Sequence, residues 1–302
     1  MLDSRYLAFE TVVHEASFDR AAKRLNLTQS AVSQRIRLLE SELGQVLLVR
    51  SKPVRPTPAG RRLLPFLAQM RLLQTESQRA LALGQSRDYV RVAIGVNADS
   101  LATWFLAAVA EVVRDARVAL DFVLDDQDHT HTLLADGEVL GCVSTRPDAM
   151  RGCVALALGV MRYRCIASPA FRDRHFPAGL DRVALSRAPA IVFGRLDDMH
   201  ELFLRRHFGL DAGQFPHHVV PSSEGFEAVA AHSLGYGFVP ETQVAARLAD
   251  GSLVDLAPGR FEDVALYWHH WQVQSPVMTR LSDAIVAGAR QALLQPAASG
   301  VR

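Results

Sequence analysis

The sequence is poor in cysteine and lysine and contains no long hydrophobic run. Its three cysteines, Cys142, Cys153 and Cys165, lack the C-x-x-C spacing of metal and redox sites, which favours buried, reduced thiols. No stretch approaches the ~20 consecutive apolar residues of a membrane-spanning helix. The first residues also lack the basic-then-apolar layout of a signal peptide. We therefore expect a soluble chain located in the cytoplasm.

The sequence also lacks the short motifs that identify common classes of α/β enzyme. It has no G-x-G-x-x-G or P-loop glycine pattern, no G-x-S-x-G nucleophile turn and no H-E-x-x-H metal motif. His129 and His131 with Asp126 and Asp128 are an alternative metal site, although a polar loop explains them more simply. We expect no catalytic residues, no metal and no cofactor, and an enzyme is kept only as an alternative.

The balance of charge differs between the two parts of the chain. Residues 1–88 contain 14 Lys and Arg against 8 Asp and Glu, whereas the remaining residues contain 19 against 24. The formal net charge of +1 therefore conceals a basic N-terminal part and a mildly acidic body. Because clustered positive charge attracts polyanions, this asymmetry indicates a polyanionic partner for the N-terminal part alone.

Residues 1–58 have the pattern of three short helices followed by a two-stranded wing. Apolar residues recur at helical spacing in two short segments, and a third helix is expected from Gln29 to a glycine stop at Gly44. A basic β-wing follows directly, with strands over 46–50 and 54–57. This order predicts a winged helix-turn-helix domain.

The third helix carries short polar and amide side chains on the face opposite its apolar positions. Such side chains near a helix N-terminus are suited to reading base edges in the major groove, while cations grip phosphate. An ordinary solvated helix face is the alternative, but the basic wing favours contact with double-stranded DNA. The residues expected to contact DNA are Thr28, Gln29, Ser30, Ser33, Gln34, Arg35, Arg37, Arg50, Lys52, Arg55 and Thr57.

Several segments of this head closely resemble, in register, the DNA-binding domain of LysR-type transcriptional regulators. They are residues 17–25, 28–36, 39–40, 43–44 and 57–60. The family usually has phenylalanine where this sequence has Leu48. The resemblance implies a bacterial regulator that binds promoter DNA and acts on RNA polymerase.

Residues 59–87 predict a long helix that links the head to the body. Thr57-Pro58 is a good helix start, and Pro65 is expected to kink the helix or to delay its beginning. An apolar seam at alternating steps of three and four favours pairing of two chains over packing within one chain. The seam residues are Leu63, Phe66, Met70, Leu73, Ser77 and Ala80. In the LysR family this helix is the dimer arm, so the resemblance implies a homodimer that assembles further into a tetramer.

Residues 88–302 predict a sensor domain of two α/β lobes that the chain crosses twice. Strands and helices alternate, which favours mostly parallel sheets with helices on both faces. We place the crossings near Met161 and Trp268. Lobe 1 then comprises 88–161 and 268–302, and lobe 2 comprises 162–267. The whole chain is expected to be an α+β multidomain protein whose sensor resembles periplasmic binding proteins.

In such lobes a ligand binds beyond the C-terminal ends of the strands, where helix N-termini point. A helix start near Ser100 offers N–H groups to a carboxylate, and three further loops at strand ends are rich in acid. This combination suits an amino acid with a cationic side chain, although helix capping explains many of the same residues. The residues expected to bind the effector are Asn97, Asp99, Ser100, Thr103, Asp125, Asp126, Asp128, Asp197, Asp198, Ser222, Ser223 and Glu224.

Segments of the body resemble one branch of the LysR family, the branch that responds to arginine or lysine and controls basic amino-acid export. They are residues 96–105, 196–200, 222–226 and 267–268. The resemblance implies lysine, arginine or else histidine as the effector, and activation of an exporter gene. One alternative is a LysR-type regulator of another regulon that senses an organic or aromatic acid in a basic pocket. Another is a solute-binding module without DNA activity, which the basic head opposes.

Overall fold

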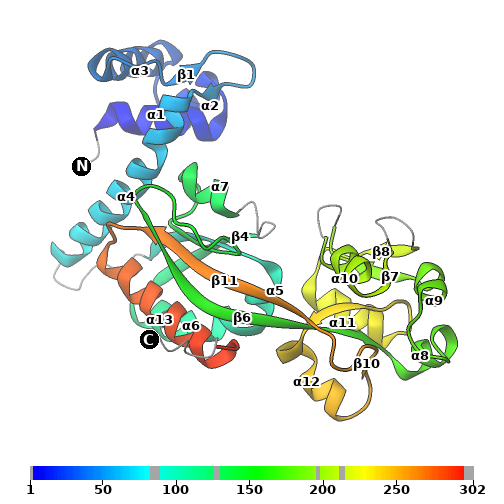
Figure 1. The fold of residues 1–302 in the computed structure, drawn as a ribbon. Helices are drawn as coiled ribbons and strands as arrows, with labels where there is room; N and C mark the ends of the chain where they lie inside the picture. The colour runs from blue at the N-terminus through cyan, green and yellow to red at the C-terminus, as the bar shows by residue number, and fades with distance from the viewer. Residues whose placement is uncertain (1–2, 82–88, 125–129, 195–197, 211–214, 296–302) are drawn as a thin grey trace, which may run out of the picture.

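The computed structural model describes residues 3–81, 89–124, 130–194, 198–210 and 215–295. Figure 1 shows a small head, a long helix, and a body whose two lobes are joined by a pair of long strands. Within these described ranges no helix is both long and apolar enough to cross a membrane. The expected fold class is confirmed.

The head consists of three helices and a two-stranded wing. These elements are α1 (Ser4–Glu15), α2 (Phe18–Leu25), α3 (Gln29–Leu43), β1 (Leu48–Val49) and β2 (Arg55–Pro56). The side chains of Asp3, Ser17 and Thr28 cap the three helix starts by accepting backbone N–H bonds. Gly44 ends α3 with φ of 62°, a left-handed conformation that glycine adopts without strain. The third helix is therefore as expected, and the wing strands are shorter than expected.

Two residues from the segments that resemble the LysR family hold the wing in place. Oε1 of Glu40 accepts hydrogen bonds from the backbone N–H groups of Leu47 at 2.8 Å and of Leu48 at 3.2 Å. Gly60 passes so close to the wing that a Cβ atom there would lie 2.2 Å from the carbonyl oxygen of Leu47. The wing therefore requires an acceptor at position 40 and no side chain at position 60.

The linker helix α4 (Pro58–Leu81) joins the head to lobe 1. It begins at Pro58 and continues through Pro65, so of the two effects expected of this proline, a kink or a delayed start, the delayed start does not occur. Pro65 is buried, and Gly137 of lobe 1 packs against it so closely that a Cβ there would lie 2.6 Å from the Pro65 nitrogen. The proline, which has no N–H to donate, is thus covered by neighbouring backbone.

The linker helix has one apolar face turned inward and another turned to solvent. Leu67, Ala68 and Leu72 are buried against the chain's own head and body. Phe66 and Met70 are 55% and 47% exposed, and the rest of the expected seam from Leu73 onward is also exposed. Leu63 differs, because it packs against the core of the head. Packing within the chain therefore uses mainly the other face, although the Phe66 ring lies 5.9 Å from that of Trp271, and most of the seam stays exposed.

Lobe 1 contains a parallel three-stranded arrangement with helices against it. Its elements are β3 (Val90–Val96), α5 (Ala98–Ser100), the π-helical turn η1 (Leu101–Phe105), α6 (Leu106–Asp115), β4 (Val118–Leu124), α7 (Thr130–Ala135), β5 (Gly141–Ser144) and α13 (Pro276–Ala292). The strand β3 pairs in parallel with both β4 and β5. Helices α6 and α13 pack tightly, since a Cβ on Gly288 would lie 2.3 Å from the Cβ of Ala108.

Lobe 2 has shorter strands and more helices. Its elements are α8 (Pro169–His175), α9 (Arg182–Arg187), β7 (Ala190–Val192), α10 (Met199–Phe208), β8 (His217–Val219), α11 (Ser223–Ala231), β9 (Gly237–Pro240), α12 (Glu241–Ala249) and β10 (Val254–Asp255). Buried aromatic rings, among them Phe171, Phe176 and Tyr236, pack against one another in its core. These rings belong to a hydrophobic cluster that continues into lobe 1, where it includes Val92 and Trp268.

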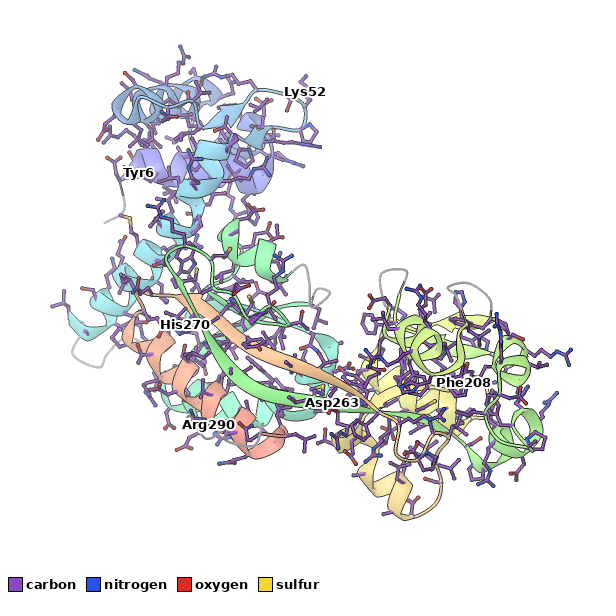
Figure 2. The ribbon with its side chains drawn as sticks, viewed as in Figure 1. Tyr6, Lys52, Phe208, Asp263, His270 and Arg290 are labelled. Atoms are coloured by element: carbon purple, nitrogen blue, oxygen red, sulfur yellow. The ribbon has the colours of Figure 1, made fainter. Side chains whose placement is uncertain are left out.

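The long strands β6 (Cys153–Ala167) and β11 (Glu262–Trp271) carry the chain out of lobe 1 and back. They pair antiparallel, so the expectation of mostly parallel strands is wrong here, because the chain leaves on one strand and returns on its neighbour. Met161 lies opposite Val264, whereas Trp268 pairs with β5 inside lobe 1. The residue opposite Met161 on the return strand is thus Val264, four residues before Trp268 and within the several residues by which the crossings were placed. Figure 2 shows Asp263 at the junction of the lobes.

Candidate DNA-binding surface and effector site

One face of the head gathers exposed polar side chains from α3 and the wing. On α3 they are Thr28, Gln29, Ser30, Gln34 and Arg37, and on the wing Arg50, Lys52 and Arg55. Figure 2 shows Lys52 projecting from the loop between β1 and β2. Amide side chains are suited to base edges and cations to phosphates, so the residue types of this surface are those that DNA binding needs.

Three other residues expected at this surface interact with groups within the head. Ser33 is buried, and its hydroxyl accepts a hydrogen bond from Nη2 of Arg37 at 3.2 Å, so it orients that arginine. Arg35 lies partly buried on another side of α3, near Asp3. There the pKa of Asp3 is lowered to about 2, mainly by hydrogen bonds from Arg5 and to a smaller extent by the Arg35 charge.

Thr57 joins the wing to the linker helix. Its hydroxyl donates to the carbonyl oxygen of Val46 at 2.6 Å and accepts from the backbone N–H of Gly60 at 3.1 Å. Both of these bonds lie within the head. Thr57 therefore positions the wing, and its hydroxyl is already engaged.

Asp99 connects three parts of the body through one carboxylate. Ser223 Oγ donates to Oδ1 of Asp99 at 2.6 Å, and the hydroxyl of Tyr163 donates to Oδ2 at 2.7 Å. Asp99 belongs to α5 of lobe 1, Ser223 to α11 of lobe 2, and Tyr163 to the crossing strand β6. The acid therefore lies where the two lobes meet.

The surroundings of Asp99 disfavour its negative charge. Burial raises the pKa of Asp99, the hydrogen bonds from Ser223 and Tyr163 oppose this effect, and the charge of Glu224 adds to it. Ser223 Oγ also lies 2.9 Å from Oε1 of Gln243, yet its single proton can serve only one acceptor. A protonated Asp99 that donates to Ser223 would satisfy both contacts. A cationic ligand would instead favour the ionised acid.

Asn97 and Ser100 flank Asp99 with buried polar atoms that have no partner. Asn97 occupies the N-cap position of α5, but its side chain makes no capping hydrogen bond. Its Oδ1 and Nδ2, and Oγ of Ser100, are buried without a hydrogen-bond partner among the described residues. Because such groups are costly to bury unpaired, they indicate a site for a polar ligand. The π-helical turn that follows is a feature often found at functional sites.

The remaining expected effector residues are distributed differently. Thr103 donates within its own helix to the carbonyl oxygen of Asp99 at 2.6 Å. Ser222 caps α11 and donates to Oε2 of the exposed Glu224 at 3.1 Å. Asp198 is exposed at the start of α10 and makes no capping bond with its side chain. The residues that lie outside the described ranges are Asp125, Asp126, Asp128 and Asp197.

Tyr163 and Gln243 also belong to this cluster, and neither was predicted from the sequence. Tyr163 has a weak signal in the sequence, because it follows the expected crossing at Met161 by two residues and shares its face of the strand. Gln243 lies on α12, and its Nε2 donates to the backbone carbonyl of Ser223 at 3.0 Å. Nothing in its sequence surroundings marks it.

Known proteins resemble this chain over nearly its whole length. Residues 4–61 match the bacterial regulatory helix-turn-helix protein family of the lysR type, and residues 83–290 match the LysR substrate binding domain. The regulator ArgP of Aeromonas salmonicida is 43% identical over 95% of this chain and 96% of its own length. ArgP of Pseudomonas aeruginosa strain UCBPP-PA14 is 46% identical over the same shares.

Solved structures agree with these relatives. The crystal structure of ArgP from Mycobacterium tuberculosis has 40% identity and a TM-score of 0.86, covering 98% of this chain and 100% of that one. Full-length LysG from Corynebacterium glutamicum with bound effector Arg has 34% identity and a TM-score of 0.80 at the same coverage. Since the named relatives are regulators, an enzyme is set aside. The chain belongs to the LysR family of DNA-binding transcriptional regulators and is of the ArgP and LysG type.

Proposed function

We propose that this regulator binds a basic amino acid, arginine or lysine, between its lobes and thereby activates the gene of a basic amino-acid exporter. The observation that carries the proposal is Asp99, an acid held between the lobes and flanked by the unpartnered side chains of Asn97 and Ser100. The LysG relative with bound Arg supports the same class of effector. The exporter target is inferred from the resemblance of the sequence.

The charges of the site favour a ligand with two cationic groups. Asp99 can pair with one of them, and Glu224, whose charge acts on Asp99, lies at the exposed edge of the same cluster. Arginine and lysine carry an α-ammonium group and a cationic side chain. Asn97 and Ser100 would then form hydrogen bonds with the other polar atoms of the ligand. An organic acid has no cationic group to pair with an ionised Asp99.

For DNA binding we infer a homodimer paired through the exposed seam of α4. The uncovered apolar side chains Phe66, Met70 and Leu73 lie at helical spacing, as in a coiled-coil seam. Two heads fixed to such a pair would contact the two halves of an interrupted palindrome. Two dimers on one bent site, in contact with RNA polymerase, complete the proposed assembly.

Thermal unfolding against a panel of small molecules tests the effector. The panel contains L-arginine, L-lysine, L-histidine, neutral amino acids, and organic and aromatic acids. A ligand present at 100 times its Kd should stabilise the protein by about 2.7 kcal/mol. Stabilisation by basic amino acids alone is expected. Stabilisation by an organic acid instead would leave the assignment as a DNA-binding regulator intact. It would refute the proposals of a basic amino-acid effector and of an exporter gene as the target.

A further inference from the structure

The C-terminal part of the linker helix is attached to lobe 1 by two side chains. Nη1 and Nη2 of Arg79 both donate to the carbonyl oxygen of Ala116, each at 3.2 Å. Oε1 of Glu76 accepts from the hydroxyl of Ser275 at 2.5 Å. Glu76 and Arg79 are three residues apart and therefore lie on the same face of α4. They form what we call the linker joint.

The charges of the linker joint match the helix ends that they touch. Ala116 is the C-cap of α6, where the unpaired carbonyl groups are partially negative, and Arg79 lies against it. Ser275 is the N-cap of α13, where the helix end is partially positive, and Glu76 lies against it. Both side chains therefore stabilise the docking of α4 electrostatically as well as by hydrogen bonding.

One of these two helices leads directly from the effector site. The helical run α5–η1–α6 covers residues 98–115, which corresponds to about 27 Å at 1.5 Å per residue. It begins at Asp99 and Ser100 and ends at the carbonyl group that Arg79 holds. Close packing of Gly288 on Ala108 ties this run to α13. A displacement at the effector site would therefore reach both partners of the linker joint together.

The contact between α4 and lobe 1 is incompletely packed next to the linker joint. A small cavity of about 10 Å³, with room for at most about one water molecule, lies between the helix and the lobe. Gln69 and Trp271 line it, and their side-chain nitrogens are buried without a hydrogen-bond partner among the described residues. Because protein interiors are normally close-packed with their polar groups hydrogen-bonded, this contact is less completely formed than the rest of the interior.

We propose that Glu76 and Arg79 transmit the state of the effector site to the DNA-binding head through α6, α13 and the linker helix. The proposal rests on the effector site proposed above and assigns these two residues the role of coupling residues, which touch neither effector nor DNA. Energetic coupling requires a physical element whose arrangement both sites influence. The linker joint is that element.

Hydrogen–deuterium exchange of the full-length protein, with and without saturating L-arginine, tests this assignment. The variants are Arg79→Gln and Glu76→Ala, each of which breaks one contact. A variant is used if its unfolding temperature equals that of the wild type, and one such variant is enough to test the coupling role. The matched control is Arg114→Gln, which removes an exposed arginine from the last turn of α6 and leaves both contacts in place. Peptides over 98–103 report the effector site, and peptides over 69–81 report the linker.

In wild type and control, arginine should change exchange in both peptide regions, by about fivefold or more at the linker. In Arg79→Gln and Glu76→Ala the change over 98–103 should persist, and the linker change should be lost. A linker response in the variants equal to that of the wild type would overturn the coupling role and leave the effector intact. If wild-type residues 98–103 respond to neither L-arginine nor L-lysine, the proposed effector fails, and the coupling inference fails with it.

Discussion

Replacing Asp99 by asparagine removes the charge at the meeting point of the lobes and preserves the shape of the side chain. The amide oxygen of asparagine can still accept from Tyr163 or Ser223, whose hydroxyl groups can rotate to suit the change. Burial disfavours the charge of Asp99, so its removal should not lower the unfolding temperature of the free protein. Binding of a cationic effector should weaken strongly, because its partner is lost.

The size of that loss follows from the burial of the pair. Removing one member of a buried ion pair costs roughly 3–5 kcal/mol. Since the raised pKa of Asp99 means that some free energy is spent on ionising it, the lower end of this range applies. At about 1.4 kcal/mol per factor of ten, the Kd for arginine should rise about 100-fold or more.

Isothermal titration calorimetry with L-arginine measures this change. Asp121→Asn is the matched control, because Asp121 is an exposed aspartate on β4 of the same lobe. The control should bind like the wild type. If Asp99→Asn and wild type bind arginine with the same Kd while both remain folded, Asp99 does not pair with the cation, and the reasoning is refuted.

Further outcomes follow from the same structure. Because the pKa of Asp99 is raised above its usual 3.8, arginine binding should release protons, and its affinity should increase with pH above 3.8 until Asp99 is ionised in the free protein. The stability of the free protein should fall over that window, since the folded state holds the proton more tightly; titration heats that are independent of the buffer's protonation enthalpy would contradict this. On DNA, Arg37→Ala should weaken binding to all duplexes, whereas Gln34→Ala should lose about 1–3 kcal/mol of discrimination between operator and shuffled DNA in fluorescence anisotropy. Unchanged discrimination in Gln34→Ala would remove Gln34 from base reading. Met70→Glu should dissociate the dimer in sedimentation experiments, and the exposed control Gln78→Glu should not; a dimer that survives Met70→Glu would place the interface elsewhere.

Where a helix or strand is determined by residues near it in the sequence, its position could be predicted. The helix from Gln29 to Leu43 has a threonine cap before it and a glycine stop after it, and the structure gives these bounds. The apolar stretches over 90–96 and 118–124 form β3 and β4, which belong to the alternation of strands and helices predicted for residues 88–302. Helix caps and strand runs depend on neighbours in sequence, so one chain suffices to find them.

Features that depend on contacts distant in sequence were not predictable in the same way. Ser33 belongs to the polar pattern of α3, but the packing of α3 in the head buries it. Tyr163 and Asp99 are 64 residues apart, and only the crossing of β6 between the lobes brings them together. The antiparallel pairing of β6 with β11 likewise follows from the route of the chain and not from the pattern of either strand.

The two hydroxyl groups on Asp99 act as internal competitors of the effector. A carboxylate has about four lone-pair positions, and Tyr163 and Ser223 each occupy one. A cation that binds Asp99 must share the carboxylate with these hydroxyls or displace them. The two hydroxyls therefore lower the affinity for the effector and help to set the concentration at which the regulator responds. A substitution such as Tyr163→Phe would shift the dose–response curve along the concentration axis without altering the acid that recognises the cation. With the cation recognised by Asp99 as proposed, selectivity and sensitivity belong to different side chains and can diverge independently.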